Sequence, residues 1–211
     1  MNTAPGRETA PVDFSSVVRR RRMVRRFTDE PVDDAVVGGL LDLARRAPSA
    51  GNSQGVAFVV LRGSAETGRY WDATLPAGRR PQFRFPGLVA APVLVVVATR
   101  PDAYLERYAE PDKAGTGLGD DVDRWTVPYW WVDAGAAVEH LLLGVVEAGL
   151  GACFFGVFDH EPAVRAELGV PDGWRVVGTV ALGHPADGDE RGASAGRPRR
   201  PLDEIVHRGG W

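Results

Sequence analysis

A long apolar helix in the middle of the chain constrains the fold more than any other feature of the sequence. The run VDAGAAVEHLLLGVVEAG, residues 132–149, carries apolar side chains at helical spacing, with Asp133 as the predicted N-cap and Gly149 as the predicted stop. Because this run is apolar nearly all round, it predicts a central helix that is buried on most of its surface. The other elements of the fold must then pack around it.

Four short apolar runs predict the strands of a sheet. They are VAFVVL (residues 56–61), APVLVVVAT (91–99), GACFFGVF (151–158) and WRVVGTVALG (174–183). The first two have the continuous apolar character of central strands that are covered on both faces.

Shorter helices are predicted on either side of these runs. Asp13 is a suitable N-cap for a helix over residues 14–27, and residues 36–44 show i, i+3, i+4 apolar spacing before Pro48. Another short helix is predicted over residues 161–169. Because the strands and helices do not alternate as regular βαβ units, the predicted fold class is α+β.

Composition predicts a single domain. With 211 residues, of which 44% are apolar, the chain has the size of one globular unit, which we expect over residues 14–211. Residues 1–13 lack the basic start and apolar core of a secretory signal, so we expect a disordered leader. No apolar run is both long and unbroken enough for a transmembrane helix, and the single Cys153 fits a reducing compartment. We therefore expect a cytoplasmic protein without a membrane partner.

The charge pattern does not favour nucleic-acid binding. A basic run, RRRRMVRR at residues 19–26, invites that interpretation, but the formal net charge of the chain is −3. We therefore expect no nucleic-acid partner.

The usual catalytic motifs are missing from the sequence. Neither G-x-G-x-x-G after a strand nor G-x-x-x-x-G-K-[ST] occurs, which argues against a Rossmann domain and a P-loop enzyme. The four histidines have no metal-ligand spacing, so no metal site is predicted. No G-x-S-x-G motif is present, and Cys153 has no neighbouring base. The interpretations as an acid–base, metal-dependent or nucleophilic enzyme all lose support together.

Arginines are grouped at two distant places in the chain. Arg21, Arg22 and Arg25 lie in the first predicted helix, where Arg21 and Arg25 would share a face, and a second group contains Arg199 and Arg200. A guanidinium group suits phosphate because it is planar, always charged and able to bind in a bidentate way. Either the two groups close on one phosphate, or both are solvated charge runs.

One loop is more polar than a surface turn requires. RAPSAGNSQG, residues 46–55, lies between a predicted helix and a predicted strand and contains Ser49, Asn52 and Gln54. Such a concentration of hydrogen-bonding side chains predicts a ligand contact.

Two aromatic-rich segments, residues 69–87 and 100–131, show no clear periodicity. We expect them to be irregular and to form lids or pocket walls, or else surface loops. The aromatic residues that could stack on a flat substrate, or else belong to ordinary packing, are Phe83, Phe85, Trp125, Tyr129, Trp130 and Trp131.

Four motifs, taken in order, resemble the landmarks of the nitroreductase family of FMN-dependent flavoproteins. They are RRMVRRF (21–27), APSAGNSQ (47–54), DAGAAVEHLLLGVVEAGLGA (133–152), and ALGHP with RRPLDEIVH (181–207). The resemblance covers nearly the whole chain from Val17 onward. It implies a nitroreductase-like fold, with a central and mostly antiparallel sheet flanked by helices. It also implies a homodimer that holds FMN in sites shared between the two chains.

The resemblance further implies contacts to the cofactor. Arg21 and Arg22 match residues near the flavin phosphate and ribityl chain, and Arg25 matches a cation at the N1/O2 edge that stabilises the charge of reduced flavin. Met23 stands in place of the usual Ser, and Arg199 or Arg200 would lie at the phosphate. At Gly151 and Ala152 a bare surface would let a backbone N–H reach the ring. The remaining implied cofactor-binding residues are Pro48, Ser49 and Ala50 from the partner chain, together with Asn52 and Gln54.

The function implied by the resemblance is that of an NAD(P)H-dependent FMN oxidoreductase. A hydride would pass through flavin N5 to a nitroaromatic, quinone or similar flat electron acceptor by a ping-pong mechanism, in which no catalytic protein acid or base is obligatory. Two alternatives stay open: a flavin-dependent enone reductase or dehydrogenase of a biosynthetic pathway, and a flavin-binding protein without turnover.

Overall fold

A four-stranded antiparallel sheet organises the chain. The computed structural model of the protein describes residues 13–189 and 192–211. The strand order is β1-β2-β4-β3, and every neighbouring pair is antiparallel. The strands are β1 (Val56–Arg62), β2 (Val93–Thr99), β3 (Gly151–Phe155) and β4 (Arg175–Gly183). All four lie where the sequence predicts them.

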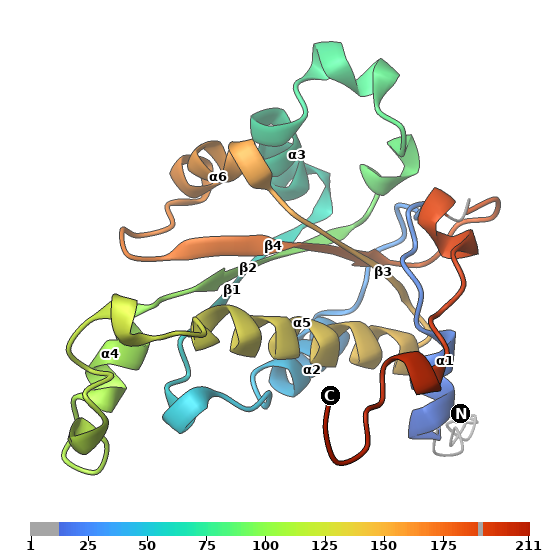
Figure 1. Cartoon of the computed structure of the whole chain (residues 1–211). Helices are drawn as coiled ribbons and strands as arrows, with labels where there is room; N and C mark the ends of the chain where they lie inside the picture. Colours follow the sequence, from blue (N-terminus) through green and yellow to red (C-terminus); the bar gives the residue numbers. More distant parts are fainter. Residues whose placement is uncertain (1–12, 190–191) are drawn as a thin grey trace, which may run out of the picture.

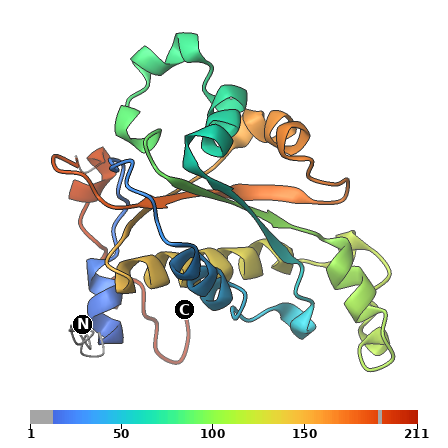
Figure 2. The same ribbon diagram turned by 180° about the vertical axis from the view of Figure 1, so that it is seen from behind.

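Helices cover both faces of this sheet. Figures 1 and 2 show α5 and α2 on one face, and α3 and α6 on the other. The α-helices are α1 (Phe14–Arg20), α2 (Asp34–Ala44), α3 (Gly63–Thr74), α4 (Asp102–Tyr108), α5 (Tyr129–Glu147) and α6 (Glu161–Leu168). The α+β class, with an antiparallel sheet flanked by helices, is therefore confirmed. None of the helices in the described part of the chain combines the length and hydropathy that crossing a membrane requires.

The core lies in two layers that meet at β2, a strand in which every residue is buried. Val93, Val95 and Val97 pack into the layer that contains residues of α2 and α5. Leu94 and Val96 point to the opposite face and pack into the layer that contains residues of α3 and α6. Because successive side chains of a strand alternate between faces, a strand covered on both sides reads as one continuous apolar run.

β1 is an edge strand, so the prediction of a central strand is wrong for it. Among the described residues it pairs only with β2, and most of its residues are half-buried. Its apolar run has another cause, because β1 contacts α5 on one face and α3 on the other. Cover on both faces makes a strand apolar whether or not both of its edges are paired.

The central helix α5 begins earlier than the sequence predicts. It starts at Tyr129, so Asp133 lies inside the helix and is buried instead of acting as the N-cap. Its predicted end is confirmed: the last helical residue is Glu147, and Gly149 follows with a φ of +74°.

The first helix is much shorter than predicted. Asp13 does cap α1, because its side chain accepts a hydrogen bond from the Ser16 N–H, but α1 ends at Arg20. Residues 21–27 are extended instead, and the Val24 N–H donates to the Ala152 carbonyl at 2.8 Å. Pairing with β3 therefore outweighs the helical spacing, which means that Arg21 and Arg25 do not share a helix face.

The two segments predicted to be irregular contain regular structure. α3 extends into residues 69–87, and α4 lies within residues 100–131, with short 3₁₀ turns in the remainder of both segments. The end of the chain has a single 3₁₀ turn at Leu202–Glu204 and is exposed. Residues 1–12 of the predicted leader lie outside the described residues, so this prediction stays open.

Candidate functional site

A cavity of about 640 Å³ near α1 brings the two groups of arginines together. We call it the arginine cavity. It is lined by Arg19, Arg20, Arg21, Arg22, Met23, Arg25, Gly192, Ala195 and Arg199. Six of these nine residues are arginines, and Arg199 comes from the opposite end of the sequence. The two groups therefore face one space, and four of the six arginines are exposed. A shared phosphate contact stays a prediction.

The neighbouring Arg200 lies outside this set. Its Nε donates to Glu204 Oε2 at 3.2 Å, and its Nη2 donates to the Glu204 carbonyl at 2.8 Å. Of the two tail arginines proposed from the sequence, Arg199 is thus the one at the cavity.

Asp189 holds the extended segment that carries the arginines. Its Oδ1 accepts a hydrogen bond from the Arg25 backbone N–H at 2.8 Å, and its Oδ2 contacts the Arg22 guanidinium. Only 4% of the Asp189 side chain is exposed. The sequence did not identify this residue, because a single Asp in a Gly- and Asp-rich linker carries no signal of burial.

Arg25 is also positioned by an aromatic ring. Its guanidinium lies over the ring of Phe85, 5.1 Å from the centroid, which is within cation–π range. Phe85 makes an edge-to-face contact with Phe83, with centroids 6.3 Å apart. Arg25 and Phe85 both line a second cavity of about 510 Å³ that adjoins the arginine cavity through Arg25. Phe85, a predicted pocket residue, is therefore close to the predicted cofactor residues.

Cys153 lies near Arg25, and its thiol is buried. The thiol is buried in β3, and burial raises its pKa above the usual value, an effect that Arg25 only partly offsets. A raised pKa disfavours the thiolate, which is the reactive form of cysteine.

Residues 48–54, which we call the polar loop, line a different cavity. This cavity, of about 550 Å³, is lined by Pro48, Ser49, Asn52 and Gln54 and reaches Asp133 of α5. Ala50 is not among the lining residues of this cavity, and its backbone N–H donates to Asp133 Oδ2 at 2.8 Å. Ser49 Oγ accepts a hydrogen bond from the Gln54 N–H at 3.1 Å.

The two cavities do not form one site within a single chain. No residue lines both of them. In Figures 1 and 2 the turn that contains the polar loop lies near α4, whereas α1 lies at the opposite end of α5. The predicted cofactor contacts are therefore divided between two ends of the molecule.

Gly151 and Ala152 are covered by the chain itself. Both are buried, and Ala152 forms a bridge with Met23. A Cβ added to Gly151 would approach Val24 to 2.9 Å and Pro185 to 3.0 Å. The prediction of a bare surface at this point is therefore wrong, because the extended segment after α1 packs over it. A cofactor contact there stays a prediction.

The predicted aromatic pocket residues are likewise split. Trp125 and Trp130 are buried and pack with Tyr104, so they belong to a small core cluster. Tyr129 and Trp131, at the start of α5, are partly exposed. Phe83 and Phe85 lie elsewhere, beside Arg25 and Trp71. The six residues do not line one pocket in a single chain.

Comparisons with known proteins agree on one family. A family model for the nitroreductase family matches residues 18–184. The chain is 31% identical over 219 residues to an NADH dehydrogenase of Thermus thermophilus, covering 94% of this chain and 97% of that one. It is 30% identical over 233 residues to a 4-nitrobenzoate reductase of Nocardioides sp., covering 92% and 88% respectively.

A solved structure also resembles this fold closely. It is a protein of Desulfovibrio desulfuricans that was crystallised in complex with FMN. The TM-score is 0.66 at 26% sequence identity, and the match covers 96% of this chain and 99% of the other.

Proposed function

We propose that this chain, which belongs to the nitroreductase family, transfers a hydride from NAD(P)H through bound FMN to a flat small-molecule acceptor. It is an NAD(P)H-dependent oxidoreductase that uses FMN, as the family and the relatives indicate. The nature of the acceptor, the residues that bind the cofactor and the ping-pong order are our proposal.

The arginine cavity is the observation that carries this proposal. FMN ends in a phosphate that is doubly negative near neutral pH, and guanidinium groups bind phosphate with paired, charge-assisted hydrogen bonds. Six arginines around about 640 Å³ match such a group in charge, and the cavity volume lies within the range of ordinary ligand sites. Arg21, Arg22 and Arg199 would hold the phosphate.

FMN, when bound, supplies the hydride chemistry at N5. The chain must hold the ring and keep a cation near the edge that becomes negatively charged on reduction. Arg25 suits this role because two contacts hold it, one between its backbone N–H and Asp189 and one between its guanidinium and Phe85. A cation fixed in this way does not have to reorganise when the charge develops.

The polar loop would contact the cofactor of the partner chain. Its cavity lies apart from the arginine cavity, so one chain does not bring the two halves together. A two-fold dimer places the same surfaces of both chains against each other, and the loop of one chain can then reach the arginines of the other. Ser49, Asn52 and Gln54 would supply hydrogen bonds to the polar edge of the ring.

A nitroaromatic or quinone is the acceptor class that we propose. One relative is named a 4-nitrobenzoate reductase, and partly exposed aromatic side chains at Tyr129, Trp131 and Phe85 could stack on a flat substrate. No group that would act as an acid or base in the reaction is required in this mechanism. The donor and the acceptor would occupy the same face of the ring in turn, which is a ping-pong order.

The test is reduction and reoxidation of the purified protein. After reconstitution with FMN, NADPH or NADH should bleach the flavin absorbance without oxygen, and 4-nitrobenzoate or a benzoquinone should restore it. Initial rates at several fixed acceptor concentrations should give parallel double-reciprocal lines. A protein that fails to bind FMN, or that holds FMN which neither nicotinamide reduces, would contradict the proposal.

A further inference from the structure

The polar loop contains two non-glycine residues, Asn52 and Gln54, in a strained backbone conformation. Gly51, Asn52 and Gln54 have φ values of +61°, +58° and +51°, in the left-handed region that side chains other than glycine rarely adopt. Among the described residues, only Phe158 is a further non-glycine residue with positive φ. Such conformations persist only where the surrounding structure over-determines them. The question is therefore what holds this loop.

A buried carboxylate of α5 holds its first residue. Asp133 Oδ2 accepts hydrogen bonds from the Ala50 backbone N–H and from the Tyr104 hydroxyl, both at 2.8 Å. The Asp133 residue is only 6% exposed. Burial and the nearby Asp133 carboxylate raise the pKa of Tyr104, so its hydroxyl remains a hydrogen-bond donor. One oxygen atom thus joins the loop, α4 and α5.

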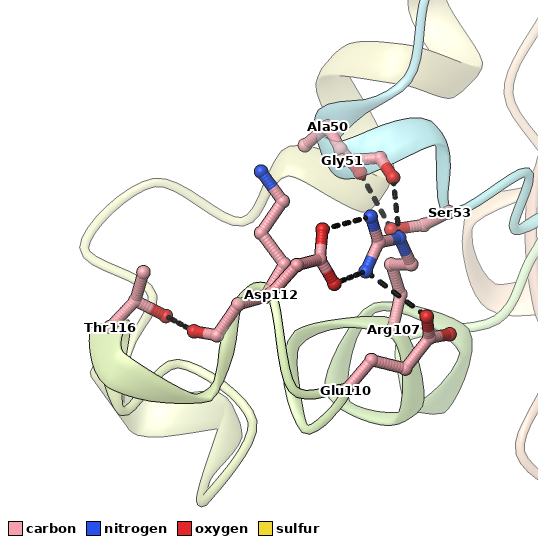
Figure 3. Close-up of polar contacts among 8 residues, drawn as sticks. Ala50, Gly51, Ser53, Arg107, Glu110, Asp112 and Thr116 are labelled. Carbon is pink, nitrogen blue, oxygen red and sulfur yellow. Dashed lines mark hydrogen bonds and ion pairs between the residues drawn. The ribbon is translucent and has the colours of Figure 1, made fainter.

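A guanidinium of α4 holds the middle of the loop (Figure 3). Arg107 Nε donates to the Gly51 carbonyl at 2.8 Å. The two other nitrogens of the same group donate to both oxygens of Asp112, at 2.7 and 2.8 Å. This bidentate pair fixes the plane of the guanidinium and leaves Nε directed at the loop.

Aromatic packing leaves the loop little room to move toward α4. A Cβ added to Gly51 would approach the ring of Tyr108 to 2.8 Å, and one added to Gly55 would approach the ring of Tyr104 to 2.6 Å. Both tyrosines belong to α4. The loop is therefore held by hydrogen bonds at Ala50 and Gly51 and by close contact with the α4 rings.

We propose that Arg107 and Asp133 are positioning residues that hold the polar loop in its cofactor-binding conformation. The inference rests on the proposed function, because it assigns a purpose to the loop of a shared FMN site. It also gives a role to α4, which carries Arg107 and Tyr104.

Arg100 provides a matched control on the same segment. Its guanidinium forms a bidentate pair with Glu106, at 3.0 and 2.6 Å, much as Arg107 does with Asp112. Within the described residues, the Arg100 side chain donates no hydrogen bond to the polar loop. R100A therefore removes a comparable bidentate pair and leaves the loop contact intact. R107A removes its bidentate pair, a further contact to Glu110 at 3.2 Å and the loop contact.

The experiment compares R107A, R107K and R100A with the native chain. Hydrogen exchange followed by mass spectrometry should show residues 49–55 exchanging about tenfold faster in R107A, and FMN titration should show an affinity about tenfold weaker. R107K should give an exchange rate and an FMN affinity between those of R107A and the native chain. The lysine ammonium can reach the Gly51 carbonyl but cannot form the bidentate pair of a guanidinium. R100A should match the native chain in both measurements, and the melting temperatures of R107A and R100A should agree.

The two measurements separate the inference from the function on which it rests. Equal exchange and equal FMN affinity in R107A and R100A would overturn the positioning role, even where the native chain binds FMN and is reduced. A native chain that fails to bind FMN would overturn the proposed function and the inference with it. Faster exchange in R107A with unchanged FMN affinity would show that Arg107 orders the loop without serving the cofactor, which also overturns the inference.

Discussion

The arginine cavity and the polar loop are built in opposite ways. The cavity is lined mainly by long charged side chains from α1, from the extended segment after it and from the tail. Two of them, Arg19 and Arg22, have side chains that are 72% and 44% exposed. The polar loop is a short, strained backbone held by a carboxylate that is almost fully buried. The first region provides positive charge, and the second provides a fixed backbone conformation.

This difference indicates which physical property limits cofactor binding in each half of the proposed site. Exposed charges act over a distance, are screened by salt and tolerate small displacements. A strained loop acts only at contact and depends on each hydrogen bond that holds it. Removing one arginine should therefore weaken binding gradually, whereas removing the buried support of the loop should affect the whole fold.

The largest effect is expected from D133A, which removes the buried support of the polar loop. The Tyr104 hydroxyl would lose its acceptor in a buried place, and the Ala50 N–H would lose its acceptor in a part-buried one. An unsatisfied buried donor costs about 1–3 kcal/mol and a part-buried one costs less, so the free energy of unfolding should fall by about 2–4 kcal/mol. Urea denaturation measures this. D133N keeps an acceptor oxygen and should lose about half as much, and equal stability of D133A and the native chain would contradict the role of this carboxylate.

A smaller effect, confined to binding, is expected from R25A. The variant removes the cation placed over Phe85 but leaves the backbone hydrogen bond to Asp189 in place. Loss of one charge-assisted contact should weaken FMN binding by about tenfold, with little change in the free energy of unfolding. Flavin fluorescence titration gives the dissociation constant. R25K retains the charge and should lose less, whereas unchanged affinity in R25A would refute the proposed cation.

Salt should distinguish the two regions without any mutation. Raising the ionic strength from about 0.01 M to about 1 M shortens the screening length from about 30 Å to about 3 Å. FMN affinity should then fall by roughly fivefold, because the phosphate contacts depend on partly exposed guanidinium groups. Hydrogen exchange of residues 49–55 should change much less, since Asp133 is buried and the Arg107 contact to the loop goes to a neutral carbonyl. Faster exchange of the loop at high salt, or an FMN affinity that does not change with salt, would contradict the proposed difference between the two regions.

The sequence predicted those elements whose burial by neighbouring elements is visible in the local composition. The four strands and the end of α5 were found because cover on both faces makes a run apolar, and because Gly149 suits a positive φ. The end of α1 was missed because residues 21–27 have helical spacing, while their pairing with Ala152 is a contact between distant parts of the chain.

The candidate site was predictable in its residue types but not in its supports. Arginines and polar loop residues are visible in the sequence, and the resemblance places them in order. Asp133 looks like an N-cap until the longer helix places it inside α5, and Arg107 lies in a segment with no clear pattern. Supports of this kind are set by tertiary geometry, so no local rule in the sequence reveals them.

The smallest expected effect separates the two tail arginines. Arg199 lines the arginine cavity, whereas both hydrogen bonds of the Arg200 guanidinium in the described structure go to Glu204. R199A should weaken FMN binding by about threefold, because one arginine among six contributes a partly screened charge. R200A loses an exposed pair of the kind that contributes about 0–1 kcal/mol to stability, and should bind FMN as the native chain does. Titration of both variants at low salt gives the clearest comparison. A larger loss in R200A than in R199A would mean that the tail adopts a different arrangement when the phosphate binds, and that charge alone does not define this half of the site.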